Sequence, residues 1–148
     1  MINSYLSRQI TQNFPHNPTE DQFSALKTLT DFLLSVESDT LLLLKGYAGT
    51  GKTSLVGALV KTLNELQQKT FLLAPTGRAA KVFSNYSGQK AYTIHKKIYR
   101  QKAFSNEPTG FMPADNLHKD TLFIVDEASM ISNDGIDSIS FGTGRLLD

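Results

Sequence analysis

The chain has 148 residues, 40% of them apolar, and a formal net charge of +1. This length predicts a single domain, 1–148, with a sizeable core, and the composition excludes a disordered or low-complexity chain. The small charge provides no general attraction for nucleic acid, so any such contact has to be local. Because cysteine is absent, disulfides, thiolate metal sites and a cysteine nucleophile are excluded.

The chain shows no sign of a membrane or export segment. Met1–Phe14 lacks the basic start and apolar run of a secretory signal. The longest apolar run, Leu41–Leu44, is far shorter than the roughly 20 residues that span a bilayer. We therefore expect a soluble, cytoplasmic protein with no membrane partner.

The first predicted helix runs from Thr19 to Ser35. Pro15 and Pro18 precede it, and Thr19 followed three residues later by Gln22 forms a capping-box pattern. Apolar residues recur at helical spacing along it: Phe23, Leu26, Leu29, Phe32 and Leu33.

Short apolar runs predict three strands, at 41–45, 70–74 and 121–125. The first of them reads as a strand buried on both faces. Helices are predicted between and after the strands, at 52–67, 77–86 and 93–100, with a loop at 101–119 and a weakly helical tail at 133–148.

Strands that alternate with helices predict an α/β fold, with a parallel sheet flanked by helices. Each predicted strand ends in a polar turn: Gly46–Thr53, Pro75–Gly77 and Asp126–Glu127. Ligands of such sheets bind at the carboxyl ends of the strands. We therefore expect the three turns to converge on one edge.

Gly46–Thr53 has the pattern of a phosphate-binding loop: glycine, four residues, then Gly-Lys-Thr. Gly46, Gly49, Thr50 and Gly51 belong to the turn whose backbone N–H groups surround a phosphate, and the glycines supply the backbone freedom. The following helix directs its positive end at the same anion.

Two side chains at the end of this loop carry further chemistry. Lys52 would neutralise the β- and γ-phosphates of ATP, and the Thr53 hydroxyl would coordinate Mg²⁺. A glycine-rich turn without a ligand is the alternative, and the flanking strand and helix argue against it.

Asp126 and Glu127 follow the last predicted strand. Beside a phosphate-binding loop, Asp126 is suited to hold Mg²⁺, and Glu127 is suited to orient and deprotonate the attacking water. A second carboxylate here favours hydrolysis over phosphoryl transfer to a small molecule. By itself the pair would read equally well as a solvated acidic turn.

Four blocks occur in a familiar order: Gly46–Thr53, Ala74–Lys81, Thr93–His95 and Val125–Met130. Together they resemble the N-terminal RecA-like domain of superfamily 1 DNA helicases, in particular the RecD-like group that includes the phage Dda helicase. The resemblance runs from Thr19 to Met130. It implies a RecA-like three-layer sandwich, ATP hydrolysis, and 5′ to 3′ movement on single-stranded DNA.

The resemblance also implies roles for single residues. Gln22 matches the glutamine that reads the adenine edge, with simple helix capping as the alternative. The matches to DNA-contacting motifs are Pro75, Thr76, Arg78, Thr93 and His95. Packing against the sheet edge is the alternative for His95.

Further basic and aromatic residues have weaker claims to these roles. Tyr47 is expected near the nucleotide, and Lys81 adds charge near Arg78. The basic residues Lys96, Lys97, Arg100 and Lys102 follow His95 and read equally well as a solvated face. Candidates for stacking on bases, with ordinary packing as the alternative, are Phe83, Tyr86, Tyr92 and Tyr99. His16 and His118 have no zinc-site spacing.

The helicases of this group contain a second RecA-like domain, whose arginine completes the ATP site. The expected motifs after Asp126–Glu127 are not found before Asp148, and Arg145 is a poor candidate for that arginine. We therefore expect an incomplete fold that binds Mg·ATP weakly, hydrolyses it slowly and does not unwind DNA alone. An uncovered sheet edge would favour self-association. Two alternatives remain open: a small-molecule kinase, and a nucleotide-binding interaction module that never hydrolyses.

Overall fold

The computed structural model describes residues 2–37, 39–101 and 111–131. The chain forms two compact units, Met1–Gln67 and Gln68–Asp148. Within the described ranges, no helix has both the length and the apolar character needed to cross a membrane.

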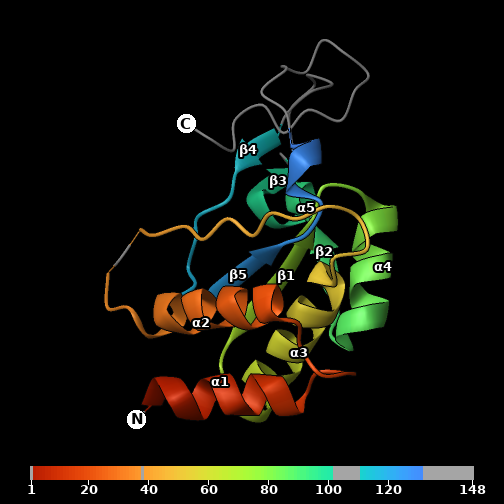
Figure 1. Cartoon of the computed structure of the whole chain (residues 1–148). Helices are drawn as coiled ribbons and strands as arrows, with labels where there is room; N and C mark the ends of the chain where they lie inside the picture. Colours follow the sequence, from red (N-terminus) through yellow and green to blue (C-terminus); the bar gives the residue numbers. More distant parts are fainter. Residues whose placement is uncertain (1, 38, 102–110, 132–148) are drawn as a thin grey trace. The chain divides into compact units, whose positions relative to one another are not determined.

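The first unit is helical. It contains α1 (Ile2–Gln12), α2 (Glu20–Leu34) and α3 (Lys52–Glu65), and α1 contacts both other helices (Figure 1). Their buried apolar side chains form the core of this unit: Leu6, Ile10, Phe14, Leu26, Leu55, Ala58, Leu59, Val60 and Leu63. Helix α1 was not predicted, because only two of these residues, four positions apart, mark its buried face.

The predicted start of α2 is confirmed in detail. The Thr19 hydroxyl accepts the Gln22 backbone N–H at 3.3 Å, and the Gln22 side-chain oxygen accepts the Thr19 backbone N–H at 3.0 Å. This reciprocal pair is the predicted capping box, and it satisfies donors that would otherwise lack a partner at the helix start.

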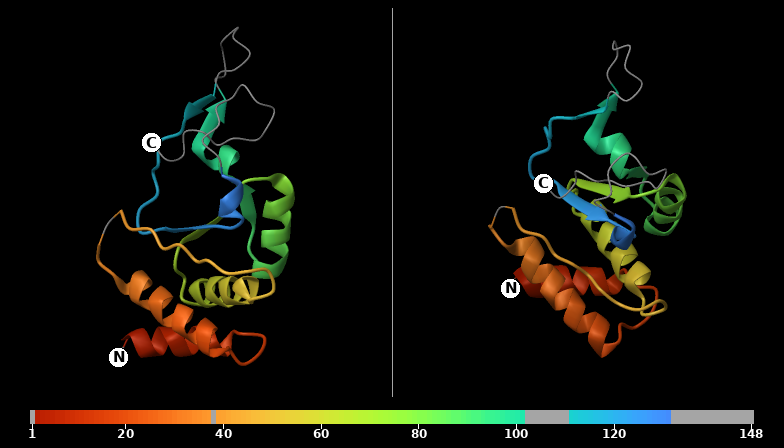
Figure 2. Two further views of the ribbon diagram at one scale, coloured as in Figure 1. Left: turned by 45° about the horizontal axis from the view of Figure 1, so that its top comes forward. Right: turned by 90° about the horizontal axis from the view of Figure 1, so that it is seen from above.

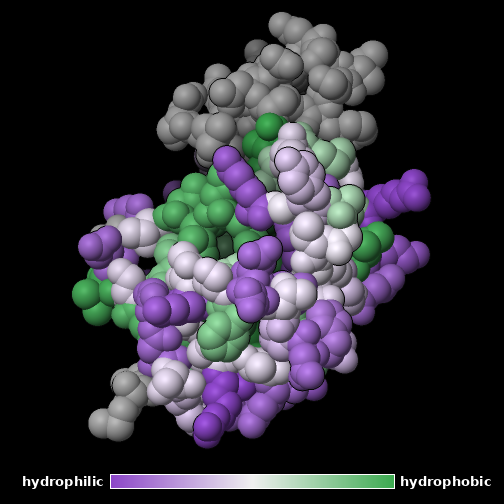
Figure 3. Space-filling view, in the orientation of Figure 1, coloured by the Kyte–Doolittle hydropathy of each residue, from purple (hydrophilic) through white to green (hydrophobic). Residues whose placement is uncertain are grey.

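The strand predicted at 41–45 is wrong: the segment is irregular. Leu41 is 89% exposed and Leu43 is 60% exposed. Hydrophobic residues also reach the surface on the face of the molecule shown in Figure 3. A strand needs a neighbour for its backbone hydrogen bonds. The described residues of the first unit contain no strand, so they offer no such partner.

The second unit contains a parallel sheet of β1 (Thr70–Ala74), β2 (Ala91–Thr93) and β5 (Leu122–Val125), in the order β2-β1-β5 (Figure 1). The register pairs Phe71 with Phe123 and Leu73 with Tyr92. The predicted parallel α/β fold is confirmed. The short strand β2 was missed, because three residues are too few for a recognisable period.

Helix α4 (Gly77–Ser87) packs against β1 and β2 (Figure 2). Its Ala80 and Phe83 are buried, and Leu72 is fully buried in the central strand. Gly88 ends the helix in the left-handed region, at φ 70°. The prediction of a helix from Gly77 is thereby confirmed.

The region after β2 differs from the prediction. Helix α5 is short, Ile94–Ile98, so the helix predicted at 93–100 ends early. Strand β3 (Tyr99–Gln101) follows it and pairs antiparallel with β4 (Phe111–Pro113), which lies where a loop was expected. This strand pair was missed because each strand is only three residues long, too short for a recognisable alternation of apolar and polar residues. Lys102, Arg145 and the predicted tail helix at 133–148 lie outside the described residues.

The capping box of α2 gives a test of local stability. We expect Thr19→Ala to lower the free energy of unfolding by about 1 kcal/mol, because one N–H at the helix start loses its acceptor. Urea unfolding followed by circular dichroism measures this change. Thr28→Ala, an exposed change on the same helix, should be neutral or stabilising. Equal effects of the two changes would contradict the capping role.

Candidate functional site

The predicted phosphate-binding loop lies in the first unit and leads directly into α3. Gly49 and Gly51 have φ angles of 79° and 84°, in the left-handed region that glycine adopts without strain. A side chain at Gly46 would come within 2.8 Å of the Thr50 hydroxyl. Glycine therefore avoids backbone strain at 49 and 51 and a close contact with the Thr50 side chain at 46.

Lys52 bends back over this loop. Its Nζ donates to the Gly46 carbonyl oxygen at 2.5 Å and to the Tyr47 carbonyl oxygen at 2.8 Å. The ammonium group is thus held on the loop by two neutral acceptors. A phosphate is a stronger partner for this cation, so the geometry suits an exchange of these carbonyls for an anion.

Gln22 joins α2 to the same loop. While its oxygen completes the capping box, its Nε2 donates to the Thr50 carbonyl oxygen at 2.9 Å. A Cβ added at Gly51 would lie 2.2 Å from this nitrogen. Gln22 is therefore both a capping residue and a neighbour of the loop. Its capping role is thus compatible with the expected role in reading the adenine edge. Sequence reasoning missed the contact with Thr50.

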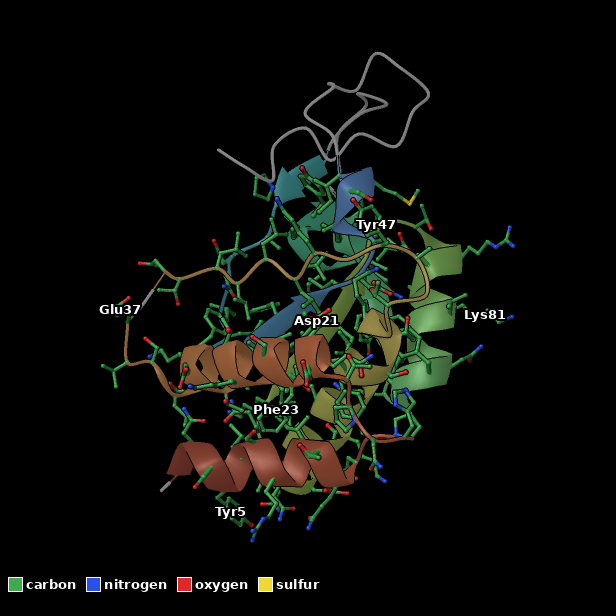
Figure 4. The ribbon with its side chains drawn as sticks, in the orientation of Figure 1. Tyr5, Asp21, Phe23, Glu37, Tyr47 and Lys81 are labelled. Carbon is green, nitrogen blue, oxygen red and sulfur yellow. The ribbon has the colours of Figure 1, made fainter. Side chains whose placement is uncertain are left out.

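The remaining loop side chains are open to solvent. Thr53 is exposed in the first turn of α3, and Tyr47 is 89% exposed and projects from the loop (Figure 4). The Thr53 hydroxyl is one oxygen of the kind that Mg²⁺ prefers.

Asp126 lies in the second unit, directly after β5, where its backbone N–H continues the sheet by donating to Leu73 at 3.0 Å. Its carboxylate has two donors. The backbone N–H of Glu127 reaches Oδ1 at 2.9 Å, and the hydroxyl of Tyr86 on α4 reaches Oδ2 at 2.8 Å. Sequence reasoning considered Tyr86 for stacking on bases or for ordinary packing, and it missed the hydrogen bond to Asp126.

Glu127 itself has an uncommon backbone. Its φ of 54° and ψ of 37° place a non-glycine residue in the left-handed region, at the start of the short 3₁₀ helix η1 (Ala128–Met130). Its side chain is exposed. Such strain is concentrated at functional sites, and here it turns the chain sharply after the second carboxylate.

The environment of Tyr86 keeps its hydroxyl protonated. Burial, then the hydrogen bond to Asp126, then the charges of Asp126 and Glu127 raise the pKa of Tyr86 far above its ordinary value. The phenol is consequently a donor, not an acceptor, towards Asp126 at any physiological pH.

The second unit also contains both threonines expected to contact DNA, and each caps a helix. Thr76 accepts the Ala79 N–H at 3.1 Å at the start of α4, and Thr93 accepts the Lys96 N–H at 3.3 Å at the start of α5. Each hydroxyl retains its own hydrogen for donation to a phosphate oxygen.

The neighbours of these threonines differ in exposure. Arg78 is exposed, and Lys81 projects away from α4 (Figure 4). Pro75 is buried, so its side chain shapes the turn, and neighbouring residues would have to make any contact with DNA. The His95 ring is half-buried and lies 5.5 Å from the Tyr99 ring.

Two lysines of the expected basic cluster lie over aromatic rings. Lys97 Nζ is 3.8 Å from the centre of the Phe71 ring and 2.5 Å from His118 Nε2, and Lys96 Nζ is 5.9 Å from the centre of the Tyr92 ring. His118 thus belongs to an aromatic and cationic cluster that its sequence position did not indicate. The side chain of Arg100 is not among those described.

Thr53 in the first unit and Asp126 in the second, the two side chains expected to hold magnesium, each carry an oxygen that this ion accepts as a ligand. The described residues contain no group of three or more His, Cys, Asp or Glu side chains that would hold a metal alone. Magnesium in phosphate-transfer sites uses one or two protein oxygens together with phosphates and water. The Thr53 hydroxyl and the Asp126 carboxylate are of this kind.

A phosphate-binding loop that leads into a helix, together with a parallel sheet and a strand that ends in Asp-Glu, is typical of P-loop nucleotide-binding proteins. The chain belongs to the AAA domain family, whose model matches residues 19–140.

The chain is also similar to a full-length helicase. It is 32% identical over 116 residues to the ATP-dependent RecD2 DNA helicase of Deinococcus radiodurans. The aligned region makes up 78% of this chain and 14% of that relative. The two comparisons confirm the resemblance to RecD-like superfamily 1 helicases.

The contact between Gln22 and the loop generates a prediction. Gly49→Ala and Gly51→Ala both place alanine at positive φ, which costs about 1 kcal/mol of unfolding free energy or more. We expect Gly51→Ala to cost a further 0.5–1.5 kcal/mol, roughly, because the new Cβ displaces Gln22 from Thr50. Urea unfolding of both variants measures the difference. The extra cost should vanish in a Gln22→Ala background, and a difference that persists there would disprove the explanation.

Proposed function

We propose that this chain is the nucleotide-binding part of a DNA helicase, in which ATP hydrolysis drives movement along single-stranded DNA and separation of a duplex. The observation that carries the proposal is the loop Gly46–Thr53, formed with two glycines in the left-handed region and with Lys52 held over its carbonyls. Membership of the AAA domain family and the similarity to a RecD2 DNA helicase support it.

In this proposal, the residues divide the work on ATP. The backbone of Gly46, Gly49, Thr50 and Gly51 surrounds the phosphates, and Lys52 moves from the loop carbonyls to the β- and γ-phosphates. Magnesium, when bound, neutralises developing charge on the phosphates. Thr53 and Asp126 would hold the ion, and Gln22 would read the adenine edge.

Glu127 orients the attacking water and accepts its proton. The transition state would also receive an arginine from a second RecA-like domain of the same motor, a contribution worth about 10³–10⁵ in rate. Without that arginine, we expect hydrolysis to be slow.

The DNA contacts in this proposal come from the second unit. Thr76 and Thr93 donate their hydroxyl hydrogens to backbone phosphates, and Arg78 adds a charge-assisted contact. His95 stacks on a base or bonds to a phosphate. These contacts are to the backbone or tolerant of base identity, which suits a motor that moves along any sequence.

The phosphate site is tested by calorimetric titration of the 148-residue chain with Mg·ATP. We expect binding in the unaltered chain and its loss in Lys52→Ala, because the loop then lacks its only lysine. Lys61→Ala, a lysine change on the same helix, is the matched control and should bind as before. Equal binding by Lys52→Ala would contradict the proposal, provided that circular dichroism shows both variants folded.

Assays of ATP turnover separate the two other functions. An interaction module would bind Mg·ATP and show no turnover even after addition of DNA and a second motor domain. A small-molecule kinase would transfer the phosphate to an acceptor and ignore DNA. The proposed helicase instead predicts that single-stranded DNA raises the rate of phosphate release.

The DNA surface is tested by Thr76→Asp. Aspartate caps a helix as well as threonine does, so α4 should remain stable. It also places a negative charge where the proposal expects a DNA phosphate, and we therefore expect single-stranded DNA to bind at least about tenfold more weakly at low salt. Fluorescence anisotropy with a labelled oligonucleotide measures this. Thr28→Asp adds the same charge on α2, and an equal loss in both variants would count against a local contact.

A further inference from the structure

The hydroxyl of Tyr86 is the least expected partner of Asp126, because 40 positions separate the two residues along the chain. We propose that Tyr86 is a positioning residue for magnesium binding: by holding Oδ2, it fixes the plane of the Asp126 carboxylate in the orientation that receives the ion. This inference rests on the proposed function, since it deepens the role assigned there to Asp126.

The geometry of the carboxylate supports this role. One donor, the Glu127 N–H on Oδ1, leaves the group free to turn about its terminal bond. A second donor on the other oxygen removes that freedom, because the two bonds come from different directions and different elements. Each carboxylate oxygen can accept two hydrogen bonds, so both oxygens retain capacity for an ion or for its bound water.

Tyr86 is itself well held. Its ring stacks on Phe83 at 5.1 Å between centres and 24° between planes, and Phe83 is fully buried. Phe83 lies on α4, which packs against β1 and β2. The hydroxyl is therefore held in place by the core of the unit. A group that orients a metal ligand has to be held in this way.

The chemistry of a phenol also suits the task. A neutral hydroxyl that donates to a carboxylate orients it and leaves its negative charge in place, whereas a lysine or arginine would compete with the cation for that charge. The simpler alternative is that this hydrogen bond only fastens α4 to the end of β5. The two roles differ in whether the bond affects metal-dependent binding of ATP.

The experiment compares the affinity of the 148-residue chain for ATP with magnesium and with EDTA. Tyr86→Phe removes one oxygen and keeps the ring on Phe83. We expect its affinity for Mg·ATP to fall about tenfold, as for other groups that orient metal ligands, with metal-free ATP bound as before. Tyr5→Phe removes a hydroxyl from a 56% exposed side chain on α1 and should change neither affinity. Thermal unfolding confirms that each variant is folded.

A double-mutant cycle with Asp126→Asn provides an independent arm. If Tyr86 acts through the Asp126 carboxylate, Tyr86→Phe should have no further effect on the magnesium dependence once Asp126 is asparagine. Additive losses, or an equal loss with and without magnesium, would show that Tyr86 only stabilises the fold.

The outcomes also separate this inference from the function on which it rests. Loss of magnesium dependence in Asp126→Asn but not in Tyr86→Phe overturns the positioning role alone. Binding of ATP that persists in Lys52→Ala overturns the proposed function itself.

Discussion

Gly51, in the phosphate-binding loop, has a φ of 84° and is the residue directly before α3. This left-handed turn sets the direction in which the first N–H groups of α3 point, and an L-residue with a side chain would be strained there. It also leaves room for Gln22, whose amide reaches the Thr50 carbonyl beside it. The loop shape, the helix start and the contact with α2 therefore depend on one backbone conformation.

Several residues combine a structural hydrogen bond with a candidate functional one. Gln22 caps α2 and contacts the loop; Thr76 and Thr93 cap helices and retain a hydrogen to donate. Asp126 is likewise held by two donors before any ion is present. Groups fixed by the fold lose little freedom on binding a ligand, which reduces the entropic cost of binding.

Local patterns were predicted well from the sequence, and partners distant in the chain were not. The capping box at Thr19, the turn Gly46–Thr53 and the strands predicted at 70–74 and 121–125 follow from local sequence patterns, and all are present. The segment 41–45 shows the limit of such prediction. An apolar run indicates that a strand is possible, but it does not indicate whether a neighbouring strand is available to pair with it. The bond from Tyr86 to Asp126 depends on how α4 packs beside the sheet, which no spacing along the chain reveals.

The central claim, that Gly46–Thr53 is a formed triphosphate site, is tested most directly by mapping amide chemical shifts in the 148-residue chain as Mg·ADP is added. The account predicts that the largest shifts fall on the backbone amides of Gly49–Thr53 and on the side-chain amide of Gln22. Pyrophosphate should reproduce the shifts of the loop but not the shift of Gln22. Loop amides whose chemical shifts stay unchanged at saturating Mg·ADP would contradict the account.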